Sequence, residues 1–208
     1  MQRDDIVKYC NLMEEVKRRM NVINAFGAGS THVLYKATTV ETVYLQFRKM
    51  LELIAFGSLV ANKQLFSQIY ADFSKLWNAR KLLDDLQKVN PHFYPQPMNE
   101  VPSTTPNVVN DLVPKTSGFL TRDEFVTLYK KCGKILHSEN PYGTPIDYVE
   151  YEKSIQDWIT KIIGLTNNHV IKLVNDPNMY LVHMKENRDD RVHHYVFAPT
   201  SLPNKGKA

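Results

Sequence analysis

The segment YKKCGKILHSENPYG, residues 129–143, places basic residues, a glycine and a histidine at helical spacing. In a helix, Lys130, Gly133 and His137 lie on one edge of the apolar stripe, and Lys134 lies slightly farther round. Gly133 costs roughly 1 kcal/mol relative to alanine in a helix interior, and its missing side chain leaves a notch beside His137. Because imidazole gives and takes protons near neutral pH, the pattern predicts a site suited to proton transfer.

A simpler interpretation of His137 remains open. The helix dipole favours a protonated histidine near a helix C-terminus, so the side chain could serve only to cap the last carbonyl groups. Asn140 offers an amide three residues later. Pro141 ends the predicted helix, because the residue before a proline is pushed out of helical dihedral angles.

A charged pair, Arg48 and Glu52, lies one helical turn apart in a predicted helix that is apolar on most sides. Their shared arc is bordered by Leu45, Ala55, Phe56 and Leu59. Two charges in such surroundings cost desolvation energy unless other groups compensate for it. The pair is therefore either a structural ion pair between packed helices or the polar wall of a pocket.

Two histidines near the C-terminus are candidates for a shared face of a β-hairpin. A turn centred on residues 188–189 would pair His183 with His194. Two imidazoles could contact a metal, but no third ligand is evident, so we expect neither a metal nor a cofactor.

Apolar periodicity predicts a mainly α fold with a small β appendage. It indicates an up-and-down bundle of about five helices, over residues 4–23, 39–61, 63–89, 122–137 and 147–163. Thr121 and Glu124 have the spacing of a capping box, which would begin the fourth helix. The second helix is apolar on most sides and therefore belongs in the middle of the bundle.

The sequence after residue 165 changes to short runs rich in Val, Tyr and Leu, separated by polar turn segments. This pattern predicts a three-stranded antiparallel meander. The predicted organisation is a bundle over residues 1–165, with a proline-rich loop at about 91–120, then a meander over 166–199 and a flexible tail over 200–208.

Composition and charge favour a soluble cytoplasmic protein with no membrane contact. The 208 residues are 43% hydrophobic, and the longest apolar stretch, around 51–61, is too short to span a bilayer. The first residues carry no apolar signal core, and Cys10 and Cys132 are expected to be free thiols. The net charge of +4 permits contact with phosphates, although the dense basic stripe of a duplex-DNA binder is missing.

The long helix YLQFRKMLELIAFGSLVANK and the later helix ending KCGKILHSENP resemble the HEPN superfamily, especially its bacterial plasmid- and phage-defence branches. The resemblance covers residues 1–165 in architecture, and its motif agreement is confined to these two helices. Active members resemble metal-independent RNases, in which an arginine and a histidine four to six residues later promote attack of the ribose 2′-hydroxyl on phosphate. The resemblance also implies a homodimer and an antitoxin or defence partner.

The chain departs from this family pattern, because the motif arginine upstream of His137 is not evident. The spacing window holds two lysines and a cysteine, of which Lys130 alone lies on the correct side. Lysine lacks the bidentate fork of guanidinium. Arg48 could supply that fork from the neighbouring helix, oriented by Glu52, and Asn140 could support His137.

Two hypotheses follow from the resemblance. In the first, the protein is an endoribonuclease in which His137 is the general acid and base and Arg48 and Lys130 hold the phosphate, supported by Glu52, Asn140, Gly133 and Lys134. In the second, it is a catalytically inactive module of the same fold that binds RNA, a nucleotide or a protein partner. A purely structural or regulatory subunit is a third possibility, in which His137 is only a cap.

Overall fold

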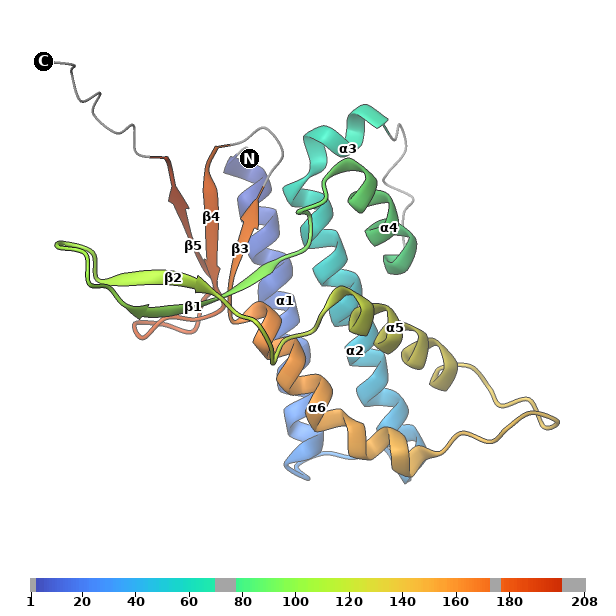
Figure 1. The fold of residues 1–208 in the computed structure, drawn as a ribbon. Helices are drawn as coiled ribbons and strands as arrows, with labels where there is room; N and C mark the ends of the chain where they lie inside the picture. The colour runs from blue at the N-terminus through green and yellow to red at the C-terminus, as the bar shows by residue number, and fades with distance from the viewer. Residues whose placement is uncertain (1–2, 70–77, 173–176, 200–208) are drawn as a thin grey trace, which may run out of the picture.

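The computed structural model describes residues 3–69, 78–172 and 177–199. The described residues form α1 (Arg3–Gly27), α2 (Lys36–Ala61), α3 (Lys63–Ile69), α4 (Ala79–Val89), β1 (Gln96–Pro102), β2 (Asn110–Pro114), α5 (Arg122–Ile135), α6 (Tyr148–Thr166), β3 (Asn168–Lys172), β4 (Met179–His183) and β5 (His193–Phe197). The predicted combination of a mainly α fold with a β part is confirmed (Figure 1). None of the described helices is both long and apolar enough to cross a lipid bilayer.

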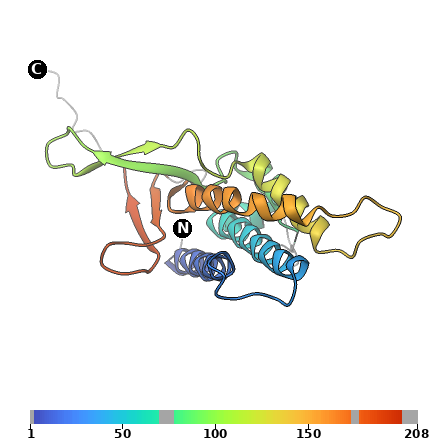
Figure 2. The same cartoon turned by 90° about the horizontal axis from the view of Figure 1, so that it is seen from below.

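Helix α2 forms the centre of the bundle, as its apolar surface predicts. It packs against α1, α4, α5 and α6, and both views of the ribbon place it between α1 and α5 (Figures 1 and 2). Phe47, Met50 and Leu51 are fully buried, and Tyr44 on the same helix donates a hydrogen bond to the backbone carbonyl of Tyr151 on α6. Burial on several sides explains why α2 has so few exposed polar positions.

The single helix predicted over residues 63–89 is wrong. The described parts are two shorter helices, α3 and α4, and α4 begins with its own cap because the Asn78 side chain accepts a hydrogen bond from the backbone N–H of Lys81. Asparagine at this position satisfies a free N–H group of the first turn. Residues 70–77, which the prediction also included, lie outside the described residues.

Helix α5 begins as predicted and ends earlier. The Thr121 hydroxyl and the Glu124 carboxylate form the predicted capping box. The helix ends at Ile135, so His137 lies beyond it and not in its last turn. Local hydrogen bonds replace the helical ones here, because the Asn140 side chain accepts from the Tyr142 N–H and the Glu139 carboxylate accepts from the Ile146 N–H.

The antiparallel meander predicted over residues 166–199 is present as β3, β4 and β5. The sheet as a whole has five antiparallel strands in the order β2-β1-β3-β4-β5, not the three predicted. The additional strands β1 and β2 form a hairpin within residues 91–120, which the sequence predicted to be a loop. Pro102 and Pro114 are the last residues of their strands and Pro97 is the second residue of β1, so all three lie near strand ends, where a missing N–H group is tolerated. Met98 of β1 packs with Val170 and Leu181 of the central strands, which gives the hairpin an apolar anchor.

The two faces of the sheet have different environments. On one face, His169, Ile171, Tyr180 and Val182 belong to the buried side that packs toward the helices. The opposite face carries the smaller apolar cluster around Met98. Strand β1 pairs with β3 only at residues 96–97 and then continues with β2 away from β3 (Figure 1).

The predicted pairing of His183 with His194 is wrong by one residue. His183 pairs with His193, and Val182 pairs with His194. An isolated β-bridge between Glu186 and Asp189 closes the turn after β4. The chain from Asp189 to His193 therefore holds one residue more than the chain from His183 to Glu186. A shift of one residue moves a side chain to the other face. His194 accordingly contacts Cys10 of α1, 3.7 Å from its sulfur, away from His183.

Candidate functional site

Arg48 joins α2 to α5 through contacts on both helices. Its Nε lies 3.2 Å from Glu52 Oε1 on the same helix, and its Nη2 donates a 3.1 Å hydrogen bond to the hydroxyl of Tyr129 on α5. The guanidinium carbon lies 4.6 Å from the centre of the Tyr129 ring, which adds a cation–π contact. The side chain is 24% exposed, so the cation is fixed in position and still reaches solvent.

Gly133 is the position on α5 that faces this guanidinium. A β-carbon placed on Gly133 would lie 3.6 Å from Arg48 Nη1. The guanidinium therefore stands over the notch that the missing side chain leaves. Two of the residues chosen from the sequence, which are 85 positions apart, thus meet in space.

Glu52 contacts two cationic side chains, Arg48 and Lys49, because its second carboxylate oxygen lies 3.2 Å from Lys49 Nζ. The buried neighbour on α5 is Cys132, and burial raises the pKa of its thiol to about 12. Cys132 is therefore protonated at neutral pH and unsuited to act as a nucleophile or a metal ligand. Where α2 packs on α5, the functional group available to a ligand is therefore a guanidinium held in place beside a carboxylate.

Lys130 and Lys134 lie on the exposed side of α5, one turn apart and flanking the position of Gly133. Neither lysine forms an ion pair with a carboxylate in the described part of the chain. Lys131 behaves differently, since its Nζ lies 3.4 Å from Glu150 and over the ring of Tyr151 on α6. Two lysine charges thus remain available on α5 within one helical turn of Gly133, the residue that Arg48 faces. We call Arg48, Lys130 and Lys134 the basic seam.

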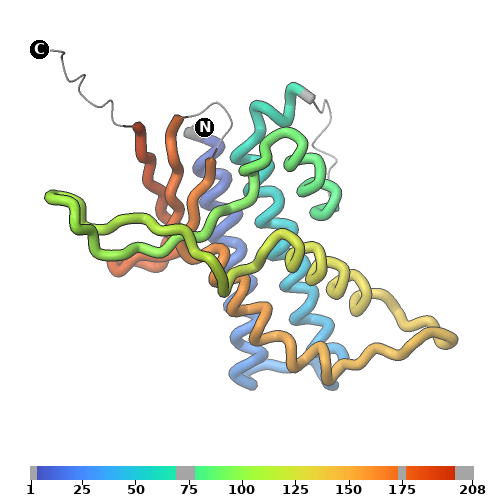
Figure 3. Tube along the Cα trace, viewed as in Figure 1, coloured from blue at the N-terminus to red at the C-terminus, as the bar shows by residue number. Residues whose placement is uncertain are grey.

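His137 and Asn140 lie in the segment between α5 and α6, which projects from the bundle as a long loop (Figure 3). His137 is exposed and makes no hydrogen bond to any other residue that the structure describes. The Asn140 carboxamide is used within its own turn, where it accepts from Tyr142. The structure therefore brings together Arg48, Glu52 and Gly133, with the two lysines exposed on α5 within a turn of Gly133. It holds neither His137 nor Asn140 against this group.

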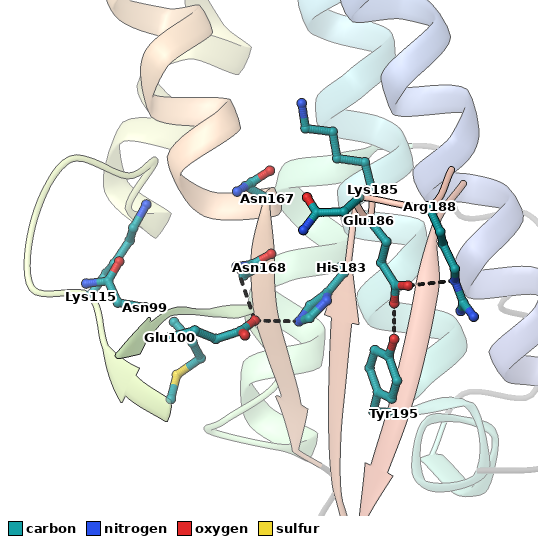
Figure 4. Close-up of a pocket in the computed structure, with 12 residues that line it drawn as sticks. Asn99, Glu100, Lys115, Asn167, Asn168, His183, Lys185, Glu186, Arg188 and Tyr195 are labelled. Atoms are coloured by element: carbon teal, nitrogen blue, oxygen red, sulfur yellow. Dashed lines mark hydrogen bonds and ion pairs between the residues drawn. The ribbon is translucent and has the colours of Figure 1, made fainter. Parts of the chain in front are cut away.

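Sequence reasoning missed a polar pocket on the sheet, shown in Figure 4. Its volume is about 930 Å³, and it is lined by residues of β1, β3, β4 and the turn after β4. His183 Nε2 lies 2.8 Å from Glu100 Oε1, a close contact that does not meet the geometry of a hydrogen bond. The hairpin β1–β2 creates this contact, and the sequence pattern of residues 91–120 indicated a loop.

A second carboxylate in the pocket, Glu186, is also paired. Its Oε2 lies 2.8 Å from Arg188 Nε, and its Oε1 accepts a hydrogen bond from the Tyr195 hydroxyl (Figure 4). The Tyr195 and His183 rings contact each other, with centroids 5.3 Å apart. The described residues contain no group of three or more His, Cys, Asp or Glu side chains placed to hold a metal ion.

In comparisons with known proteins, no protein-family model, no curated protein and no solved structure matches the chain.

Proposed function

We propose that this chain is a HEPN-like protein that binds RNA through the phosphates, at the basic seam between α2 and α5. The observation that carries the proposal is the position of Arg48, whose guanidinium is held over Gly133. Within one helical turn of Gly133, α5 also exposes two lysines without carboxylate partners among the described residues. A held guanidinium suits phosphate recognition because its N–H groups have a fixed planar geometry. Lys130 and Lys134 would add sequence-independent attraction to the backbone.

The geometry favours binding over catalysis for a physical reason. General acid–base catalysis needs a titratable group fixed within hydrogen-bond reach of the reacting proton. His137 lies past the end of α5 and has no partner among the described residues that would orient it, whereas Arg48 is fixed. Glu52 also neutralises part of the guanidinium charge, so the two lysines are expected to supply much of the affinity.

Binding is tested with a fluorescently labelled single-stranded RNA and fluorescence anisotropy. The double variant Lys130→Ala, Lys134→Ala is expected to bind about tenfold more weakly than the unchanged protein, since two phosphate contacts are lost. The matched control is Lys153→Ala, Lys172→Ala, which removes two exposed lysines that also lack carboxylate partners among the described residues. Equal affinities for the two double variants would contradict the proposal.

RNA cleavage is a second candidate function, and one feature favours it. His137 follows Gly133 by four residues, so the exposed loop carries an imidazole close in sequence to the position that Arg48 covers. Bound RNA could order this loop and bring the imidazole to a 2′-hydroxyl. The products would then end in a cyclic phosphate, and no metal would be required.

Cleavage is tested in EDTA at neutral pH with the variant His137→Ala. Loss of cyclic-phosphate products in this variant, with RNA affinity retained, is the expected result if the imidazole transfers the proton. His32→Ala is the matched control because His32 is also exposed in a loop. His169→Ala is unsuitable as a control, because His169 is fully buried and its loss would disturb the fold. Cleavage that survives His137→Ala would exclude this role.

A further inference from the structure

The pocket on the sheet is built by elements distant from the basic seam. Strand β1 leaves β3 after Pro97, and the opening is lined by Glu100 of β1, Asn168 of β3 and His183 of β4 (Figure 4). The volume of about 930 Å³ falls within the range of small-molecule sites. Nothing in the proposed RNA contacts of α2 and α5 uses these residues.

The carboxylates of the pocket already have partners within the protein. Glu100 contacts His183 at 2.8 Å and accepts from the Asn168 amide at 3.5 Å, and Glu186 is held by Arg188 and Tyr195. A carboxylate with such partners repels an anion less than a free one does. The acidic residues of the pocket therefore do not prevent an anionic ligand from entering.

Other polar groups in the pocket have few or no partners in the described part of the chain. Lys115 Nζ makes one long contact of 3.5 Å with the carbonyl of Gly164, and Lys185 is exposed without an ion pair among those residues. The carboxamides of Asn99 and Asn167 likewise make no hydrogen bond to another described side chain. In Figure 4 the two lysines lie on either side of Asn167 and Asn168.

These groups define the chemical class of a ligand. Two lysines supply charge-assisted hydrogen bonds to phosphate oxygens. Carboxamides both donate and accept, so they match the mixed edge of a base or the hydroxyl groups of a sugar. Tyr195, 39% exposed, offers a ring against which a planar group can stack.

We infer that this pocket binds a small phosphomonoester whose other end is a hydrogen-bonding ring, either a nucleoside monophosphate or a sugar phosphate. Lys115 or Lys185 would hold the phosphate, and the asparagines with Tyr195 would contact the ring. This inference is independent of the proposed RNA binding, because the two sites share no residue.

Isothermal titration calorimetry tests the inference with AMP, GMP, CMP, UMP and ribose 5-phosphate, and with adenosine and inorganic phosphate as partial ligands. At least one phosphomonoester is expected to bind about tenfold or more tightly than either partial ligand, since it alone can use both halves of the pocket. Binding by ribose 5-phosphate equal to that of the best nucleotide would identify a sugar phosphate. Preference for a nucleotide would identify the base as the second contact.

The variant Lys115→Ala, Lys185→Ala should weaken this binding by about tenfold or more, because charge-assisted hydrogen bonds to the phosphate are lost. Lys153→Ala serves as the control, since Lys153 is an exposed lysine of α6 outside the pocket. Both variants should keep the unfolding temperature and the RNA affinity of the unchanged protein. Absence of heat with every phosphomonoester, or unchanged affinity in the double variant, would overturn the inference whether or not RNA binds at the basic seam.

Discussion

The buried histidine His169 shows how single polar side chains are accommodated in this fold. Its Nδ1 lies 2.7 Å from the carbonyl of Thr166 and its Nε2 lies 2.6 Å from the hydroxyl of Tyr9. A carbonyl only accepts, so Nδ1 carries the proton and the Tyr9 hydroxyl donates to Nε2. Burial lowers the pKa of His169 to about 4, and burial also raises the pKa of Tyr9. Both groups are therefore neutral in the folded protein at neutral pH.

This neutral histidine makes folding stability sensitive to acid. The unfolded chain takes up a proton at this residue near pH 6.5, whereas the folded chain does so only near pH 4. Between these values the unfolded state binds more protons, so stability falls as the pH falls through this window. The contribution is about 3 kcal/mol, and this residue adds no further loss below pH 4.

Urea unfolding at pH 7, 5.5 and 4 measures this effect, with His169→Gln as the comparison. The variant is expected to lose less of its free energy of unfolding than the unchanged protein between pH 7 and 4, because glutamine does not titrate. A pH dependence identical in the two proteins would show that His169 is not the residue responsible.

The residue scale also shows how far the sequence could locate the sites. Helical spacing alone predicted that Gly133 and Lys130 lie on one side of α5. The apolar residues around Arg48 and Glu52 indicated that this charged pair lies between packed helices. The contact between His183 and Glu100, which are 83 positions apart, could not be predicted, because it depends on how the hairpin β1–β2 joins the sheet.

At the scale of elements, two glycines inside helices have opposite roles. A β-carbon on Gly133 of α5 would meet only Arg48 Nη1, at an ordinary contact distance of 3.6 Å. A β-carbon on Gly164 of α6 would lie 2.0 Å from the carbonyl oxygen of Gly118. Gly164 is thus required for the close approach of α6 to the segment that leads into α5, whereas Gly133 is not required for packing.

These contacts predict opposite effects of the same substitution. Gly133→Ala should raise the free energy of unfolding by up to about 1 kcal/mol, because alanine is the better helix former and fits the space. Gly164→Ala should lower it by at least about 2 kcal/mol, because backbone atoms must move apart. Chemical denaturation of the two variants checks both values, and destabilisation by Gly133→Ala would contradict the contact described for Arg48.

Elements were predicted well where local signals agreed. The capping box fixed the start of α5, and the apolar surface of α2 indicated its central place. Prediction failed at the hairpin β1–β2, because its prolines favoured a loop, and at the long-range pairing of β1 with β3, which no local pattern indicates. It also failed by one residue at the β4–β5 turn, because the residue added there depends on the loop conformation.

At the scale of the whole molecule, the helices and the sheet carry different candidate sites. The basic seam lies on α2 and α5, and the polar pocket lies on the sheet where β1 diverges (Figure 1). Helix α6 connects the two regions, because it packs on α2 and continues into β3. A homodimer, an antitoxin or defence partner and a cytoplasmic location remain predictions from the HEPN resemblance and the composition.

The salt dependence of RNA binding tests the central claim most directly. Each phosphate contact to single-stranded nucleic acid contributes about −0.7 to the slope of log K against log salt concentration. The account predicts that Lys130→Ala, Lys134→Ala makes this slope shallower by about 1.4, whereas Lys153→Ala, Lys172→Ala leaves it unchanged. The same slope in all three proteins, or no binding of RNA by the unchanged protein at low salt, would contradict RNA binding at the basic seam.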